Sequence, residues 1–195
     1  MFQEALAREF APYRELSPVQ LDALEKHYQL MLRWNGRLNL TRVTAVENAV
    51  QLHYCESLLL GLHLPSGPLT VADVGSGAGF PGIPIAILRP ETSMTLIESD
   101  QRKAVFLREA SRGLSNVSVA GTRADAVSGS CDWIVSRAVA YQDLFPLKFA
   151  SNFALLIGEN HAVELNASRV IRVPWGDHRV IAIVPRETFG DRATI

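Results

Sequence analysis

The chain has 195 residues, of which 48% are hydrophobic and 20% charged, a balance typical of a folded globular protein and not of a disordered one. Its formal net charge of −1 and isoelectric point near 6.5 exclude a protein that binds nucleic acid through overall basicity, so an RNA ligand would need a local basic face. No apolar run approaches the roughly 18 to 20 residues that span a bilayer, and residues 1–8 do not resemble a signal peptide, so we expect a cytoplasmic protein.

The length suits one α/β domain with a modest extension. The two cysteines, Cys55 and Cys131, are far apart and have no Cys-x-x-Cys or Cys/His ligand spacing. We therefore expect free, buried thiols and no metal site.

Residues 1–65 have helical periodicity and are predicted to form a helical extension packed on a core domain, residues 66–195. Ser17-Pro18-Val19-Gln20 predicts a helix start, because a capping Ser precedes Pro at the first helical position and Gln follows three residues after the Ser. Thr44-Ala45-Val46-Glu47 predicts a second capping box, with a helix that ends near Gly61.

Short apolar runs then alternate with helical stretches. This alternation predicts a Rossmann-like α/β fold, a mostly parallel sheet with helices on both faces. The first part contains predicted strands at 69–74, 94–98, 117–119 and 133–135 and helices at 82–88 and 101–112. The second part contains a predicted helix at 142–150 and strands at 153–157, 161–165, 170–173 and 179–184, of which the last ones are predicted to form an antiparallel edge.

The first predicted strand runs into three alternate glycines, Gly75, Gly77 and Gly79, before a helix begins. Backbone without Cβ atoms can approach a ligand closely there, and the helix N–H groups point at it, so the pattern predicts a nucleotide-type cofactor site. A dinucleotide fingerprint would need its third glycine where Phe80 stands, and no Gly-Lys-Ser/Thr of a P-loop follows. We therefore expect an S-adenosylmethionine loop of a methyltransferase.

Three carboxylates surround this loop in the sequence. Glu98 ends the next predicted strand, where it would accept hydrogen bonds from ribose hydroxyls, unless it is an exposed strand-end carboxylate. Asp125, after the third strand, could reach an adenine amino group or cap a helix. Asp73 could hold the turn or the ammonium group of the cofactor.

Further short motifs surround these residues. They are Trp34-Asn35, Asn39-Leu40-Thr41, His53, Glu56-Ser57-Leu58, Pro81-Gly82-Ile83-Pro84, Lys103, Phe106-Leu107, Arg123-Ala124-Asp125 and Ser136-Arg137-Ala138. Over residues 31–140 the sequence resembles the glucose-inhibited division protein B family, the bacterial guanine-N7 methyltransferases of 16S ribosomal RNA. The family usually has Asp where this chain has Glu56.

The resemblance implies a seven-stranded fold with a helical N-terminal extension, and S-adenosylmethionine as the cofactor. It implies cofactor contacts at Gly75, Phe80, Ala124, Asp125 and Arg137. The implied partner is 16S rRNA or the small ribosomal subunit, and we expect a monomer.

Guanine N7 has a free lone pair and no proton to remove, so we expect no general acid or base and a reaction that depends on positioning in a desolvated pocket. We predict that Arg137, Asn39 and His53 line the acceptor side of that pocket. The alternatives are a buried structural histidine for His53 and a turn cap for Asn39.

Two groups of basic residues could contact RNA. Arg33, Arg37 and Arg42 are predicted to flank the mouth of the pocket. The basic run over residues 100–123 is a second possibility, although a solvated helix face explains most such runs.

Two other functions stay open at the level of sequence. One is a NAD-dependent oxidoreductase. The other is a relative of altered specificity or without catalysis that binds RNA or S-adenosylmethionine. The second stays open because the family has a strand ending in Lys-Gly where this chain has Ile157-Gly158-Glu159, and because the C-terminal third is shortened.

Overall fold

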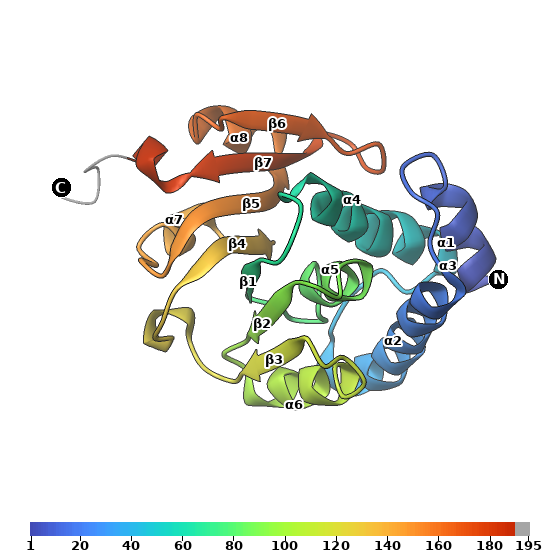
Figure 1. Ribbon diagram of the computed structural model, residues 1–195. Helices are drawn as coiled ribbons and strands as arrows, with labels where there is room; N and C mark the ends of the chain where they lie inside the picture. Colours follow the sequence, from blue (N-terminus) through green and yellow to red (C-terminus); the bar gives the residue numbers. More distant parts are fainter. Residues whose placement is uncertain (190–195) are drawn as a thin grey trace.

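The computed structural model describes residues 1–189, and its centre is a seven-stranded sheet in the order β3-β2-β1-β4-β5-β7-β6 (Figure 1). Its strands are β1 (Thr70–Val74), β2 (Ser93–Ile97), β3 (Val117–Ala120), β4 (Cys131–Arg137), β5 (Ala150–Gly158), β6 (Arg169–Arg172) and β7 (Arg179–Pro185). Strands β1 to β5 pair in parallel, whereas β7 is antiparallel to β5 and to β6. The predicted sheet with its antiparallel edge is therefore confirmed.

Helices cover both faces of this sheet (Figure 1). The α-helices are α1 (Phe2–Phe10), α2 (Pro18–Leu38), α3 (Val46–Ala49), α4 (Glu56–His63), α5 (Gly82–Leu88), α6 (Gln101–Ala110), α7 (Tyr141–Leu144) and α8 (Glu159–Glu164). A π-helix, η1 (Val50–Cys55), joins α3 to α4, and two 3₁₀ turns are η2 (Ala124–Ala126) and η3 (Arg186–Phe189). Among the residues that the structure describes, no helix is both long and apolar enough to cross a membrane.

The two faces of the sheet are separated by the alternation of side chains along each strand. Val71 of β1 and Leu156 of β5 belong to the face covered by α4, α5, α6 and the N-terminal helices. Their neighbours Ala72 and Leu155 belong to the opposite face, which packs against α7 and α8. In the central strands β1, β4 and β5 both faces are buried, so consecutive residues such as Ile134 and Val135 are apolar.

The N-terminal helices share the larger of the two cores. Phe2, Leu6 and Phe10 of α1 and Leu24 and Met31 of α2 are buried in the same cluster as the helices that cover the sheet. The start of α2 follows the sequence prediction, since the Ser17 hydroxyl accepts the Gln20 amide and the Gln20 side chain accepts the Ser17 amide. The division into two units at residue 65 stays a prediction.

The predicted capping box at Thr44 is wrong. Helix α3 begins at Val46 after the N-cap residue Ala45, and no side chain caps it. The Thr44 carbonyl instead accepts a hydrogen bond from the Tyr28 hydroxyl at 2.6 Å. Contact with α2 therefore decides the conformation of this segment, which continues as a π-helix before α4.

Two predictions in the C-terminal third are also wrong. The helix expected over 142–150 is only α7, because Pro146 has no N–H to continue it and Ala150 pairs with Cys131 as the first residue of β5. The strand expected over 161–165 is α8, in which Ala162 is buried and Val163 is 78% exposed, and Leu165, the C-cap residue, is buried at a spacing of three from Ala162. Cys131 is half-buried, so only Cys55 is the buried free thiol that we expected.

Candidate functional site

The glycine loop leaves β1 in a backbone conformation that favours glycine. Gly75, Gly77 and Gly79 have φ values of 73°, 54° and 88°. The amides of Gly75 and Ser76 donate to the Ile97 carbonyl at 2.9 and 3.1 Å, which fixes the turn to the end of β2. A Cβ at Gly75 would lie 2.4 Å from Cγ2 of Val139, so a side chain at this position would collide with the segment after β4.

Asp73 is fully buried below the loop. Its Oδ2 accepts the Gly82 amide at 3.0 Å, and a Cβ at Gly82 would lie 2.6 Å from that oxygen. Asp73 therefore holds the turn between β1 and α5. Its Oδ1 has no hydrogen-bond partner among the described residues, and burial raises the pKa of this carboxyl to about 7, against a lowering effect of the Gly82 hydrogen bond.

Glu98 closes the other side of the loop. It is 8% exposed, so the alternative of an exposed strand-end carboxylate is wrong. Its Oε2 accepts the Gly77 amide at 2.9 Å and its Oε1 accepts the Asp100 amide at 2.8 Å. An ionised carboxylate has about four acceptor positions, so Glu98 keeps capacity for further donors such as ribose hydroxyls.

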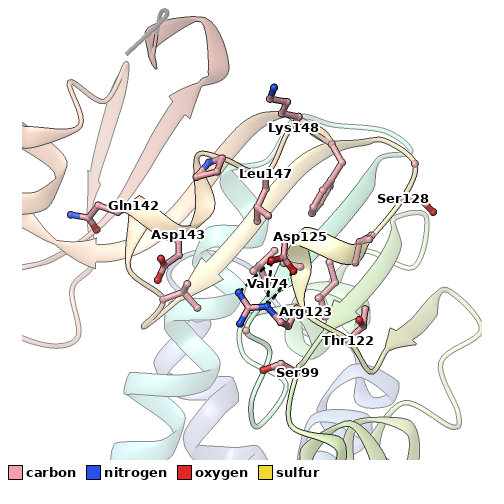
Figure 2. Close-up of a pocket in the computed structure, with 18 residues that line it drawn as sticks. Val74, Ser99, Thr122, Arg123, Asp125, Ser128, Gln142, Asp143, Leu147 and Lys148 are labelled. Atoms are coloured by element: carbon pink, nitrogen blue, oxygen red, sulfur yellow. Dashed lines mark hydrogen bonds and ion pairs between the residues drawn. The ribbon is translucent and has the colours of Figure 1, made fainter. Parts of the chain in front are cut away.

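A cavity of about 970 Å³ opens at the carboxyl ends of β1, β2, β3 and β4, where open α/β sheets bind their ligands (Figure 2). Its walls include Gly75, Ser99, Ala124 and Asp125, together with the segment that links β4 to β5. Figure 2 shows Asp125 joined to Arg123, and the two residues form an exposed ion pair at 3.3 Å. Arg123, and not Asp125, is the N-cap residue of η2, so the helix-capping alternative for Asp125 is wrong.

Arg137 ends β4 and contacts η1. Its Nη1 donates to the Leu52 carbonyl at 2.8 Å and to Nδ1 of His53 at 2.9 Å, and its guanidinium lies 5.0 Å from the Phe80 ring centre. Because Nδ1 of His53 accepts, Nε2 carries the proton and donates to the Thr41 hydroxyl at 2.8 Å. Burial and the Arg137 charge lower the pKa of His53 to about 3, so this ring is neutral.

A buried carboxylate lies behind Arg137. Glu56 is 0% exposed, and its Oε2 lies 2.8 Å from Nη2 of Arg179 and 4.0 Å from Nη1 of Arg137. Burial raises the pKa of Glu56 to about 7, while both arginines act to lower it. Burial likewise lowers the pKa of Arg137 to about 10, which Glu56 opposes. The carboxyl group of Glu56 is therefore shared by the guanidinium groups of Arg137 and Arg179.

A second cavity, of about 370 Å³, adjoins the first, and Val139 and Gln142 line both of them. Arg137 and Arg179 contribute to its wall, and Tyr141 and His161 are among the other lining residues. The structure thus brings Arg137 and His53 together beside a cavity. Asn39 is exposed at the C-cap of α2 with a φ of 48° and lines neither cavity, which fits the alternative of a turn cap.

Sequence reasoning missed three residues that shape the site. His27 of α2 is buried and contacts the Ala78 carbonyl in the glycine loop at 2.9 Å; its position in the apolar stripe between Leu24 and Met31 was the available signal. The side chain of Val139 leaves no room for a Cβ at Gly75, and Arg179 forms an ion pair with Glu56. No local pattern marks these two, because both contacts join segments that are distant in the sequence.

A family model described as rRNA small subunit methyltransferase G (GidB) matches residues 20–161 of this chain. The ribosomal RNA small subunit methyltransferase G of Nitrosomonas europaea is 43% identical over 126 residues, 63% of this chain and 58% of that protein. The protein of the same name from Halorhodospira halophila is 42% identical over 129 residues, 65% of this chain and 61% of that protein. The chain thus spans about three fifths of the length of these curated relatives.

Solved structures share the fold at low sequence identity. A SAM dependent methyltransferase from Aquifex aeolicus superimposes with a TM-score of 0.54 at 19% identity, over 70% of this chain and 93% of that chain. Mitomycin 7-O-methyltransferase gives a TM-score of 0.57 at 14% identity, over 87% of this chain and 69% of that chain. The fold is therefore that of class I methyltransferases, and with the family match over residues 20–161 the chain belongs to the rRNA small subunit methyltransferase G family.

Proposed function

We propose that this protein transfers the methyl group of S-adenosylmethionine to N7 of a guanine in the 16S rRNA of the small ribosomal subunit. The observation that carries this proposal is the glycine loop, which opens into the cavity at the carboxyl ends of β1 to β4 in a chain of this family. The names of the relatives, ribosomal RNA small subunit methyltransferase G, support the substrate class.

The residues around the first cavity suit this cofactor. Gly75, Gly77 and Gly79 form a cradle whose first position a Cβ would fill, and Phe80 completes the loop beneath Arg137. Glu98 has acceptor capacity for ribose hydroxyls, and Ala124 and Asp125 line the cavity where an adenine would lie. Asp73 supports the loop from below, because its buried carboxyl accepts the Gly82 amide, and its contact with the ammonium group of the cofactor stays a prediction.

When bound, S-adenosylmethionine supplies an electrophilic methyl group. On the acceptor side, His53 cannot act as a base, because both of its ring nitrogens are hydrogen-bonded and its pKa is lowered to about 3. A guanine N7 needs no base, since its lone pair is free. Arg137, held by Leu52 and His53, orients the acceptor from the wall of the second cavity. The contact of Asn39 with the acceptor stays a prediction, because this residue lines neither cavity.

The two predicted basic groups meet on one surface. Nη2 of Arg102 in α6 donates to the Arg37 carbonyl in α2 at 2.9 Å, so the C-terminal end of α2 adjoins the basic start of α6. Arg33, Arg37 and Arg42 are exposed there. We propose this surface, defined by the C-terminal end of α2, Arg42 and the start of α6, as the RNA-binding face, on which phosphate contacts position the substrate.

The direct test is incubation of the protein with labelled S-adenosylmethionine and undermethylated small subunits, followed by mapping of the modified base. We expect label on N7 of one guanine of 16S rRNA. Cofactor binding without transfer would instead identify a non-catalytic relative. Thermal stabilisation by NAD and not by S-adenosylmethionine would identify the oxidoreductase alternative.

Arg137→Ala tests the acceptor side. We expect methyl transfer to fall by about 100-fold, because loss of the guanidinium removes the group that orients the acceptor. Circular dichroism would verify the fold, and Arg8→Ala, at an exposed position on α1, is the matched control that should keep the wild-type rate. A folded Arg137→Ala variant with the wild-type rate would contradict the proposal.

A further inference from the structure

The second cavity has two rims of different chemistry. Arg137 of β4 and Arg179 of β7 supply guanidinium groups to its wall. Tyr141 and His161 also line it, and their rings lie 5.8 Å apart between centres at an angle of 60°. A cationic rim together with an aromatic rim is the combination that recognises a nucleotide, since phosphate pairs with guanidinium groups and bases stack on rings.

The charges on the cationic rim are not balanced locally. The two guanidinium groups share the single carboxyl of Glu56, and no Asp or Glu is among the described residues that line the cavity. His53 is neutral, and Asp73 attracts Arg137 less strongly than Glu56 does. An excess of positive charge therefore remains at the cavity wall.

Arg179 presents part of its guanidinium group to the cavity. Its Nη2 lies 2.8 Å from Oε2 of Glu56, and its Nε is buried and does not face the cavity. The side chain is 34% exposed, so an anion in the cavity can reach the remaining N–H groups of the guanidinium.

We propose that the second cavity binds the acceptor nucleotide, with its phosphate on Arg137 and Arg179 and its base beside Tyr141 and His161. The volume of about 370 Å³ suits a small ligand. The residues shared with the first cavity, Val139 and Gln142, place this nucleotide next to the methyl donor. This inference rests on the proposed function and deepens it, because it assigns Arg179 and Tyr141 to the substrate.

Direct binding tests the phosphate contact without any methyl transfer. Calorimetry would compare guanosine 5′-monophosphate with guanosine on the wild-type protein and on Arg179→Ala. We expect the monophosphate to bind about 10-fold more tightly to the wild type, and the advantage to disappear in Arg179→Ala, because a charge-assisted hydrogen bond is lost. Arg172→Ala, which removes a guanidinium that is 83% exposed on β6, is the matched control and should keep the advantage.

A pair of variants at Tyr141 tests the aromatic rim. Tyr141→Phe keeps the ring and should bind both ligands as the wild type does, whereas Tyr141→Ala should weaken both by about 10-fold through the loss of stacking. Arg179→Lys keeps a positive charge at the cavity wall and should restore part of the phosphate advantage, and circular dichroism of Arg179→Ala would verify that its loss does not come from unfolding.

Three results would overturn the assignment: no binding of the monophosphate at millimolar concentration, equal affinity of the wild type for the two ligands, or an unchanged advantage in Arg179→Ala. Methyl transfer to small subunits, measured separately, reports on the proposed function itself. A wild-type protein that methylates rRNA but shows no phosphate advantage would reject only the nucleotide pocket. A protein that shows the advantage without methyl transfer would reject only the proposed activity.

Discussion

Gly75 stands at the point where β1 leaves the sheet, and both its φ of 73° and its contact with Val139 favour glycine. We expect Gly75→Ala to lower the free energy of unfolding by roughly 1–2 kcal/mol, the cost of a left-handed conformation for a residue with a Cβ. The shift of the loop away from Val139 should also weaken S-adenosylmethionine binding by about 10-fold or more. Urea denaturation and calorimetry measure the two effects.

Gly36 offers the matched control for that substitution. It lies within α2, and a Cβ at this position would meet no atom within 4 Å. Gly36→Ala should therefore stabilise the protein by about 0.5–1 kcal/mol, because alanine is the better helix former. Equal stability and cofactor affinity of Gly75→Ala and the wild type would contradict the role of Gly75.

At the scale of elements, His27 connects α2 to both η1 and the glycine loop. Its Nε2 lies 2.9 Å from the Ala78 carbonyl, and its Nδ1 lies 2.9 Å from the Tyr54 hydroxyl. The carbonyl can only accept, so Nε2 donates to it and Nδ1 accepts from Tyr54. The loop is thus held from below by a helix of the N-terminal region.

The burial of His27 predicts a pH dependence of stability. Burial lowers the pKa of this ring from 6.5 to about 4, so between these values the unfolded chain binds more protons than the folded one. The free energy of unfolding is therefore unaffected by this ring above pH 6.5 and decreases as the pH falls from 6.5 to 4. Relative to His27→Gln, the wild type should lose on the order of 3 kcal/mol between pH 7 and 4.

Chemical denaturation of both proteins over this pH range measures that difference. The carboxyl groups of Glu56 and Asp73, whose pKa values are raised to about 7, act with the opposite sign, but they are present in both proteins and cancel in the comparison. Parallel stability curves for the wild type and His27→Gln would contradict the prediction.

Elements with strong local signals could be predicted from the sequence. Helix α5 has the predicted bounds 82–88, and the capping box at Ser17 is present, because turn and cap chemistry is encoded within a few residues. Helix α8 could not be predicted, since it is only six residues long and residues 163–167, which overlap its end, alternate apolar and polar residues as a strand does. Only packing of Ala162 and Leu165 against the sheet selects the helix.

The candidate site, too, has features that could be predicted from the sequence and features that could not. The glycine loop and Glu98 were predictable, because each follows directly from a strand end. The grouping of Arg137 with His53 was a hypothesis to which the structure gives a direct hydrogen bond. The pairing of Glu56 with Arg179 could not be predicted, because it depends on where β7 joins β5 in the sheet.

At the scale of the whole molecule, a hydrogen bond joins helix α1 to the turn between β6 and β7. The indole N–H of Trp175, in the turn between β6 and β7, donates to Oε1 of Glu9 in α1 at 2.7 Å. The Trp175 ring also packs against Tyr13 and Phe10, at 5.2 and 6.4 Å between ring centres. This contact connects the N-terminal helices to the antiparallel edge of the sheet (Figure 1).

Trp175→Phe removes the N–H and keeps an aromatic ring. We expect it to lower the free energy of unfolding by about 1.5–3 kcal/mol, the range for a hydrogen bond to a charged group. Glu9→Gln keeps a carbonyl acceptor without the charge and should cause a smaller loss. Thermal denaturation of the three proteins measures this order, and a Trp175→Phe variant as stable as the wild type would refute it.

Strand β7 lies between β5 and β6 although it is the last of the three in the chain. During translation β6 therefore emerges before the strand on which it pairs, and the sheet stays incomplete until β7 has been synthesised. The glycine loop is made long before that point, whereas Arg179 arrives with β7. We expect a nascent chain to form the glycine loop first, and to bring Arg179 beside Arg137 only once β7 has been synthesised.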